Sequence, residues 1–336
     1  STTANAVNVN AIDFTSVAAI NAGTSNGDAI ITTEAVDATL TGTDNAVDVS
    51  GINFTNVNTA GLSGGSLSGS DNADTFVLDA AGLKANEIAF TSIDAAIDAK
   101  GGNDSIAGLD GTAETFALNG TAESVGVDGF SFTNIEAINA GSGTGDAITS
   151  SILVNAELAG ADNAVTIAGI VFTNINTADL TGGALSGSAN ADTFVLDAAG
   201  LKANEILFTA INSLVNAEGG LDDVTGMAGI DWTLTANAGE LSSSPYQFTG
   251  IETADLVSQT LNGTDANNET FEISTVENVV NVKVNDINFT SVASIDAGTS
   301  TGDAVTTTET VDADLTANGN ELVASTINFS NINDAD

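Results

Sequence analysis

The side chains of this sequence best suited to chemistry are acidic residues that recur at the ends of short loops rich in glycine, asparagine and serine. Carboxylate, amide and carbonyl oxygens are the ligands that calcium prefers, and a calcium site takes about six to eight of them. We therefore name the acidic residues of these loops as candidate calcium ligands. They are Asp28, Asp74, Asp104, Asp146, Asp192, Asp222, Asp223 and Asp303.

The same loops have a second interpretation. Asp, Asn and Gly are common in tight turns, because Asp and Asn side chains bond their own backbone and Gly accepts left-handed dihedral angles. One aspartate in each loop supplies few of the oxygens that calcium requires. Calcium is therefore a candidate ligand, and the sequence predicts no required cofactor.

Composition excludes several classes of function. The 336 residues contain 45 Asp and Glu against 4 Lys and Arg, with no His and no Cys, for a net charge of −41. This removes thiol and imidazole catalysis, and it makes nucleic acid an implausible partner because phosphate binding needs clustered basic groups. No apolar run is long enough for membrane insertion. Asp222 and Asp223 form an adjacent acidic pair of the kind used in glycoside hydrolysis, but a repetitive chain provides no single special turn, so we expect no enzyme.

An internal repeat organises the chain. A phenylalanine occurs nine times in the pattern apolar-x-Phe-[Thr/Ser]-x-[Ile/Val], at intervals of 36 to 42 residues with a mean of about 39. We call these residues the first aromatic series: Phe14, Phe54, Phe90, Phe132, Phe172, Phe208, Phe248, Phe289 and Phe329. A second aromatic series interleaves with it: Phe76, Phe116, Phe194, Trp232 and Phe271. Two series with one period indicate a regular stack.

A longer repeat is superimposed on the short one. Residues 67–91 and 185–209 lie 118 positions apart and are identical at 23 of 25 positions. Three short units thus make one super-repeat. We expect a single continuous domain over residues 1–336, with super-repeats at roughly 1–118, 119–236 and 237–336.

The pattern predicts an all-β, right-handed parallel β-solenoid. Each 39-residue unit contains five or six short strands bounded by turn residues, and its apolar face can be buried only against its neighbours. We interpret the unit as two rungs of about 20 residues, with the handedness taken from the usual crossover rule. The apolar residue three positions after each Phe breaks the period of two, so the chain must turn a corner there.

Two local phrases resemble repeats of secreted bacterial proteins. The stretches GSGTGDAI (141–148) and GGNDSI (101–106) are similar to the calcium-binding nonapeptide of RTX proteins. The stretch FTNIEAINAG (132–141) is similar to repeats of hemagglutinin-like bacterial surface proteins. These resemblances imply a β-solenoid located outside the cell, with calcium held between its rungs.

We therefore expect a secreted, non-catalytic structural protein of the cell surface or the extracellular space. Its subunits would associate head to tail by β-solenoid stacking into a filament or layer, such as an S-layer. A cell-surface polysaccharide is a further candidate partner. The alternative is a stalk segment of a giant bacterial adhesin, stabilised by calcium.

Overall fold

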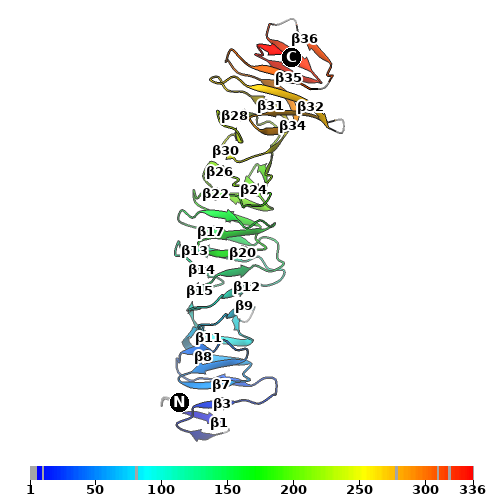
Figure 1. Cartoon of the computed structure of the whole chain (residues 1–336). Coiled ribbons are helices and arrows are strands. Elements are labelled where there is room, and N and C mark those ends of the chain that lie inside the picture. Colours follow the sequence, from blue (N-terminus) through cyan, green and yellow to red (C-terminus); the bar gives the residue numbers. More distant parts are fainter. Residues whose placement is uncertain are drawn as a thin grey trace. The chain divides into compact units, whose positions relative to one another are not determined.

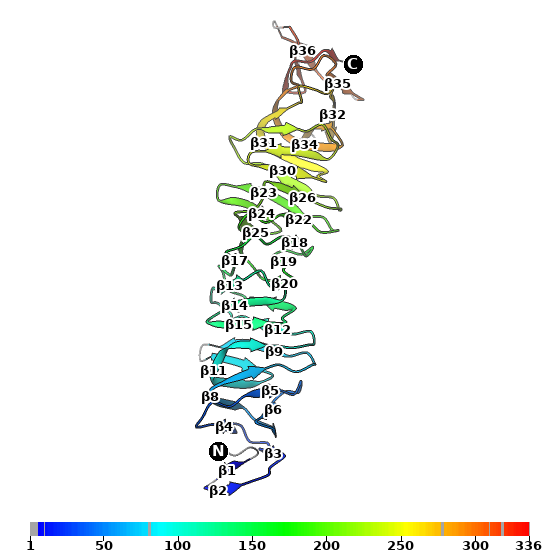
Figure 2. The same cartoon turned by 90° about the vertical axis from the view of Figure 1, so that its left-hand side faces the viewer.

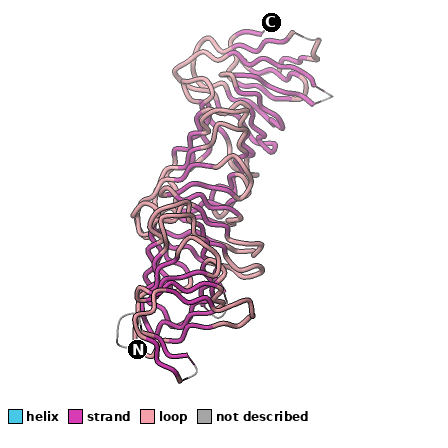
Figure 3. The backbone as a smooth tube through the Cα atoms, turned by 60° about the horizontal axis from the view of Figure 1, so that its bottom comes forward, coloured by secondary structure: helices cyan, strands magenta, loops and turns pink. Residues whose placement is uncertain are grey.

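The computed structural model contains strands, turns and loops and, among the residues that it describes, no helix (Figure 3). It describes residues 6–9, 11–79, 82–276, 279–308, 310–316 and 319–335. Stacked parallel strands form a β-solenoid of about 10 turns, which confirms the predicted fold class.

The chain divides into two units that we describe separately. Unit 1 comprises Ser1–Val154 and Asn163–Asp179, and unit 2 comprises Asn155–Asp162 and Leu180–Asp336.

The strands of unit 1 are β1 (Val7–Val9), β2 (Ile12–Phe14), β3 (Ala19–Asn21), β4 (Ala29–Ile31), β5 (Ala38–Leu40), β6 (Ala46–Val49), β7 (Ile52–Thr55), β8 (Thr59–Ser68), β9 (Thr75–Asp79), β10 (Gly82–Ala85), β11 (Ile88–Asp98), β12 (Ser105–Ala107), β13 (Thr115–Leu118), β14 (Ser124–Val127), β15 (Phe130–Thr133), β16 (Ala137–Asn139), β17 (Ala147–Ser150), β19 (Ala164–Ile167), β20 (Ile170–Thr173) and β21 (Thr177–Asp179). Those of unit 2 are β18 (Ala156–Leu158), β22 (Leu185–Ser186), β23 (Thr193–Asp197), β24 (Gly200–Ala203), β25 (Ile206–Thr209), β26 (Leu214–Asn216), β27 (Asp223–Thr225), β28 (Trp232–Leu234), β29 (Glu240–Ser243), β30 (Tyr246–Thr249), β31 (Thr253–Asn262), β32 (Thr270–Val276), β33 (Val279–Val284), β34 (Ile287–Asp296), β35 (Ala304–Thr307), β36 (Ala313–Leu315), β37 (Glu321–Ala324), β38 (Ile327–Ser330) and β39 (Asp334–Ala335).

Each unit is built from two continuous rows of hydrogen-bonded strands. In unit 1 the first row runs β3-β7-β6-β5-β8-β11-β15-β14-β13-β17-β21. The second row of unit 1 runs β4-β8-β11-β10-β9-β12-β16-β20-β19 (Figure 1). The long strands β8 and β11 belong to both rows because each of them bends. The first half of each strand pairs in the second row, and the second half pairs in the first row.

Unit 2 repeats this plan. Its first row is β25-β24-β23-β27-β31-β34-β33-β32-β35-β39. Its second row is β18-β22-β26-β30-β29-β28-β31-β34-β38-β37-β36 (Figure 2). Here β31 and β34 are the strands shared between rows.

The predicted rung length of about 20 residues was wrong. Parallel partners such as Ser105 and Thr75, or Ala137 and Val171, are 30 and 34 residues apart, so one turn is longer than predicted. The reason is that three strands of most 39-residue units form an antiparallel meander within one row, as in β13-β14-β15. The chain therefore doubles back over two strands before it crosses to the other row.

The predicted corner after each Phe of the first aromatic series is confirmed. The residue two positions after each of them has a positive φ, between 50° and 76°. These nine corner residues are Ser16, Asn56, Ser92, Asn134, Asn174, Ala210, Gly250, Ser291 and Asn331. Asparagine tolerates the left-handed region better than other non-glycine residues. Here it also bonds the preceding turn, as where Asn174 Nδ2 donates to Asn139 Oδ1 at 2.6 Å.

The core of each unit is filled by the two aromatic series. Every member of the second series is fully buried, and so is every member of the first except Phe14 and Phe54. The rings do not stack within one series as a simple ladder would. Instead a ring of one series meets the edge or face of a ring of the other, as in Phe76–Phe132 at 5.4 Å in unit 1 and Phe194–Phe248 at 5.9 Å in unit 2. Such edge-to-face contacts fix the distance between the two rows.

Candidate functional site

A series of buried carboxyl groups runs along the loops that precede the strands. Of the eight predicted aspartates, six are at most 1% exposed: Asp74, Asp104, Asp146, Asp192, Asp222 and Asp303. The other two, Asp28 and Asp223, are half-buried. Acidic side chains are almost never fully buried without partners, so these six must be held by specific contacts.

The contacts come from the backbone of the neighbouring turn. Asp104 Oδ1 accepts the N–H of Asp74 at 2.7 Å, and Glu136 Oε2 in turn accepts the N–H of Asp104 at 2.6 Å. The same relation links Asp192 to Asp222 and Asp222 to Glu252, both at 2.8 Å. In each case the carboxylate accepts a hydrogen bond from the backbone N–H of the residue just before a strand of the preceding turn. These bonds hold the loops of successive turns together.

Some of these carboxyl groups are fully satisfied. The oxygens of Asp74 accept from the Ser70 backbone N–H at 2.6 Å and from Asn86 Nδ2 at 2.5 Å. Asp192 repeats this arrangement with Ser188 and Asn204. Because both oxygens of each carboxyl group accept hydrogen bonds within the loop, Asp74 and Asp192 have a clear structural role.

Other carboxyl groups keep one buried oxygen with no hydrogen-bond donor. Among the described residues these oxygens are Asp104 Oδ2, Glu114 Oε2, Asp146 Oδ2, Asp222 Oδ2 and Glu269 Oε2. A buried charged oxygen without a partner is costly, so each of these groups calls for a proton or a cation.

Burial changes the acidity of these groups. Burial, together with the neighbouring charges of Asp74 and Glu136, raises the pKa of Asp104 to about 6. Burial and the charges of the acidic residues around it likewise raise the pKa of Asp222 to about 6. The pKa of Glu114 rises to about 7, first through burial and then through contact with Asp146.

Sequence reasoning missed two members of the series, Glu114 and Glu269. Both are only 2% exposed and occupy the position that Asp74 and Asp192 hold in other units. The signal was present, since Glu-Thr-Phe at 114–116 and 269–271 matches Asp-Thr-Phe at 74–76 and 192–194. Among the described residues, no three acidic side chains converge closely enough to hold a metal ion by themselves.

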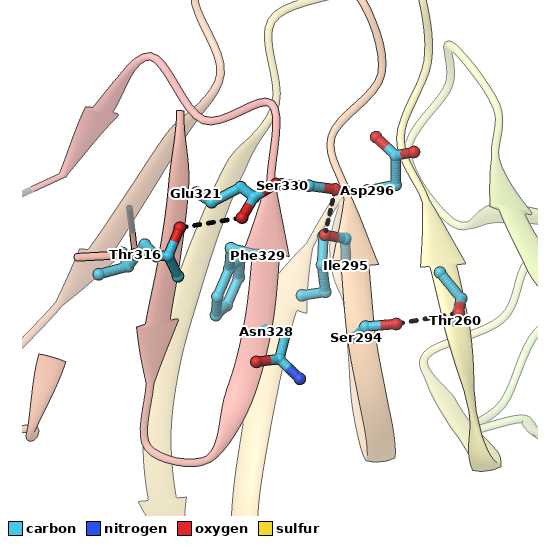
Figure 4. A pocket seen from close by; sticks show the side chains of 10 residues that line it. Thr260, Ser294, Ile295, Asp296, Thr316, Glu321, Asn328, Phe329 and Ser330 are labelled. Carbon is cyan, nitrogen blue, oxygen red and sulfur yellow. Dashed lines mark hydrogen bonds between the residues drawn. The ribbon is translucent and has the colours of Figure 1, made fainter. Parts of the chain in front are cut away.

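An open groove of about 400 Å³ in unit 2 is a second candidate (Figure 4). It lies over β31, β34, β37 and β38 and displays hydroxyl, amide and carboxylate groups. Its two acidic residues are engaged: Asp296 accepts from Asn331 Nδ2 at 2.6 Å, and Glu321 accepts from the Thr316 hydroxyl at 2.9 Å. Neither carboxyl is isolated and buried as those of the loop series are, so the loop series is the stronger candidate.

No protein-family model, curated protein or solved structure matches this chain. In the part of the chain that the structure describes, no helix has the length and apolarity needed to cross a membrane.

Proposed function

We propose that this protein is a secreted, non-catalytic structural subunit that assembles head to tail into an extracellular filament or layer. The solenoid fold supports this, because a strand row can be extended by any chain that offers a matching strand edge. The observation that carries the proposal is a pair of unfilled apolar surfaces, one in each unit.

The first surface is the β1-β2 hairpin of unit 1. Val9, Ile12 and Phe14 are 45%, 58% and 45% exposed. The equivalent hairpin β14-β15 has the same sequence pattern, but its Phe132 is fully buried beneath the neighbouring strands. The hairpin thus presents a core-type apolar face that no described residue of unit 1 covers.

The second surface is a groove of about 320 Å³ in the last turn of unit 2. Apolar side chains of Ile273, Val305, Val311 and Leu322 line it. One of its walls is β36, whose pairing among the described strands is with β37. The groove is therefore bordered by a strand edge and has room for an aromatic side chain.

These two surfaces complement each other chemically. Between turns inside each unit, the same kinds of side chain pack together, as Phe271 does against Phe329 with ring centroids 6.3 Å apart. A contact between the hairpin of one copy and the groove of the next uses two different patches, so every copy keeps a free patch for another copy, and the assembly grows as a filament wherever its rotation does not close a ring. The net charge of −41 opposes association, and we expect salt or cations to promote it.

The alternative function is a stalk segment of a giant adhesin. In that case further turns of one long polypeptide would cover both surfaces, and the purified 336-residue chain would remain monomeric at any salt concentration. The same buried loops and ring contacts would serve either role, so the state of assembly separates the two.

The test is to image the purified chain by negative-stain electron microscopy and to compare two surface variants. Phe14→Ser removes the hairpin contact and Val311→Asp removes the groove contact. Each variant alone should be monomeric, while a mixture of the two should form dimers, because each still carries one intact surface. Ile31→Ser, which changes a residue that is 81% exposed in β4, is the matched control and should form filaments. Monomeric wild-type protein would overturn the proposal.

A further inference from the structure

Two carboxyl pairs differ from the rest of the buried series. Glu114 lies within hydrogen-bond reach of Asp146 one turn later, and Glu269 lies in the same way against Asp303. All four residues are at most 2% exposed. The pairs occupy equivalent places, since Thr115 pairs with Ala147 in β13 and β17, and Thr270 pairs with Ala304 in β32 and β35.

The free oxygens of these pairs have no donor to bind. Glu114 Oε1 accepts the N–H of Leu109 at 3.1 Å and Asp146 Oδ1 accepts the N–H of Glu114 at 2.9 Å, which leaves Glu114 Oε2 and Asp146 Oδ2 unpartnered. In the second pair Glu269 Oε2 is unpartnered, while Asp303 Oδ2 accepts the Ser300 hydroxyl at 2.6 Å.

Further oxygens lie close to the pairs. A side chain added at Gly143 would meet Thr112 O at 1.9 Å and Asp146 Oδ2 at 3.0 Å, so this carbonyl oxygen and this carboxylate oxygen approach the same point. A side chain added at Gly302, next to Asp303, would meet the Asn268 amide group, with its nitrogen nearest and its oxygen at 2.9 Å. Only glycine fits at these two positions, because a Cβ would clash with its neighbours, and the oxygens that surround them are of the types that hard cations accept.

We propose that a calcium ion binds between neighbouring turns at each of two sites, one held by Glu114 and Asp146 in unit 1 and the other by Glu269 and Asp303 in unit 2. The carboxylates supply the charge, and backbone, amide and water oxygens complete the ligand set. The proposal does not depend on filament assembly.

A calcium ion at either site would link strands of adjacent turns. A cation shared by residues of two turns binds the folded stack and not the unfolded chain, so it stabilises the stack by mass action. Only two of the predicted calcium loops, those ending at Asp146 and Asp303, have this paired arrangement. In the other predicted loops, Asp104 and Asp222 accept backbone N–H groups of the turn before, and Asp223 accepts the Thr193 hydroxyl at 3.2 Å.

The test measures binding and stability of the full chain after removal of metals. We expect isothermal titration with CaCl₂ to give two bound ions per chain, and the melting temperature to rise relative to EDTA at equal ionic strength. The isosteric double variant E114Q/E269Q should bind none and lose the rise. The double variant E34Q/E157Q removes the same charge from exposed positions and should behave as wild type.

Three results would overturn the proposal. One is a melting temperature that does not respond to CaCl₂. Another is an equal response in both double variants, which would mean diffuse screening by the acidic surface. The third is a wild-type chain that binds no calcium although its melting temperature changes with pH. This would mean that the two carboxyl groups of each pair share a proton.

Discussion

Two equivalent phenylalanines in different surroundings allow the solenoid packing to be measured. Phe132 is fully buried in β15 and meets the ring of Phe76 with centroids 5.4 Å apart, whereas Phe14 in β2 is 45% exposed. Truncation of a buried Phe to Ala costs about 3–5 kcal/mol, which includes roughly 0.5–1.5 kcal/mol for the ring pair. Truncation of Phe14 removes only about half of a buried side chain and should cost roughly 1 kcal/mol in the monomer.

Urea unfolding, followed by circular dichroism at low protein concentration, measures both effects. We expect Phe132→Ala to shift the midpoint strongly and Phe14→Ala to shift it slightly, while Phe14→Ala alone abolishes sedimentation as filaments. Because solenoids can unfold in parts, the slope of each transition must be compared with that of wild type. Equal losses for the two variants would refute the account of the hairpin as an uncovered core surface.

Three further predictions test the loops and corners by the free energy of unfolding. Gly69→Ala should cost about 1–3 kcal/mol, because its new methyl group would lie 2.1 Å from Ala99 O, whereas Gly101→Ala, with nothing within 4 Å, should change stability by less than about 0.5 kcal/mol. Asn174→Val should cost about 1–2 kcal/mol more than Asn174→Gly, because both lose the side-chain bond but only Val is strained at a φ of 63°. The pKa of Asp104 and Asp222 is raised to about 6, so these two groups bind more protons in the folded chain than in the unfolded chain. Their contribution to stability should be fully present below about pH 4 and be lost as the pH rises through 6, and D104N/D222N should remove this part of the pH dependence.

The sequence was sufficient to predict the stack, the aromatic core and the corners. These features follow from one local rule, in which a residue of positive φ two positions after Phe returns the next apolar side chain to the interior. The apolar side chain that follows the corner is buried at Ile135 and Ile175 but only half-buried at Ile93 and Val292. The last two follow corners inside β11 and β34, where the chain continues as a strand instead of entering a loop.

The length of a turn could not be predicted, because the apolar pattern of a strand does not reveal the direction of its partner. Leu118, Val125 and Phe132 alternate in the same way whether their strands run parallel or antiparallel. In the structure they face one another in an antiparallel meander. Three of the five strands in a sequence unit are used in this way, so a 39-residue period coexists with parallel partners about 30 residues apart.

The burial of the acidic residues could not be predicted from the sequence either. Asp28 and Asp146 end loops of almost the same sequence, yet only Asp146 is fully buried. The difference comes from the turns around them. Asp146 bonds the Glu114 backbone of the turn before it, at 2.9 Å, while Asp28 accepts from Ser25 of its own loop, at 3.1 Å. A single sequence shows that an aspartate ends a loop, but not whether a neighbouring turn covers it.

The meander also changes how stability is distributed along the stack. In a simple solenoid each repeat touches only its neighbours and can be added one at a time. Here the meander β5-β6-β7 is inserted between β3, which precedes it in sequence, and β8, which follows it. The row is therefore incomplete until the later strand has folded, and no single turn closes its own hydrogen bonds. We infer that the cooperative element of a unit is longer than one turn, so a change in one meander strand should destabilise the turns on both sides of it.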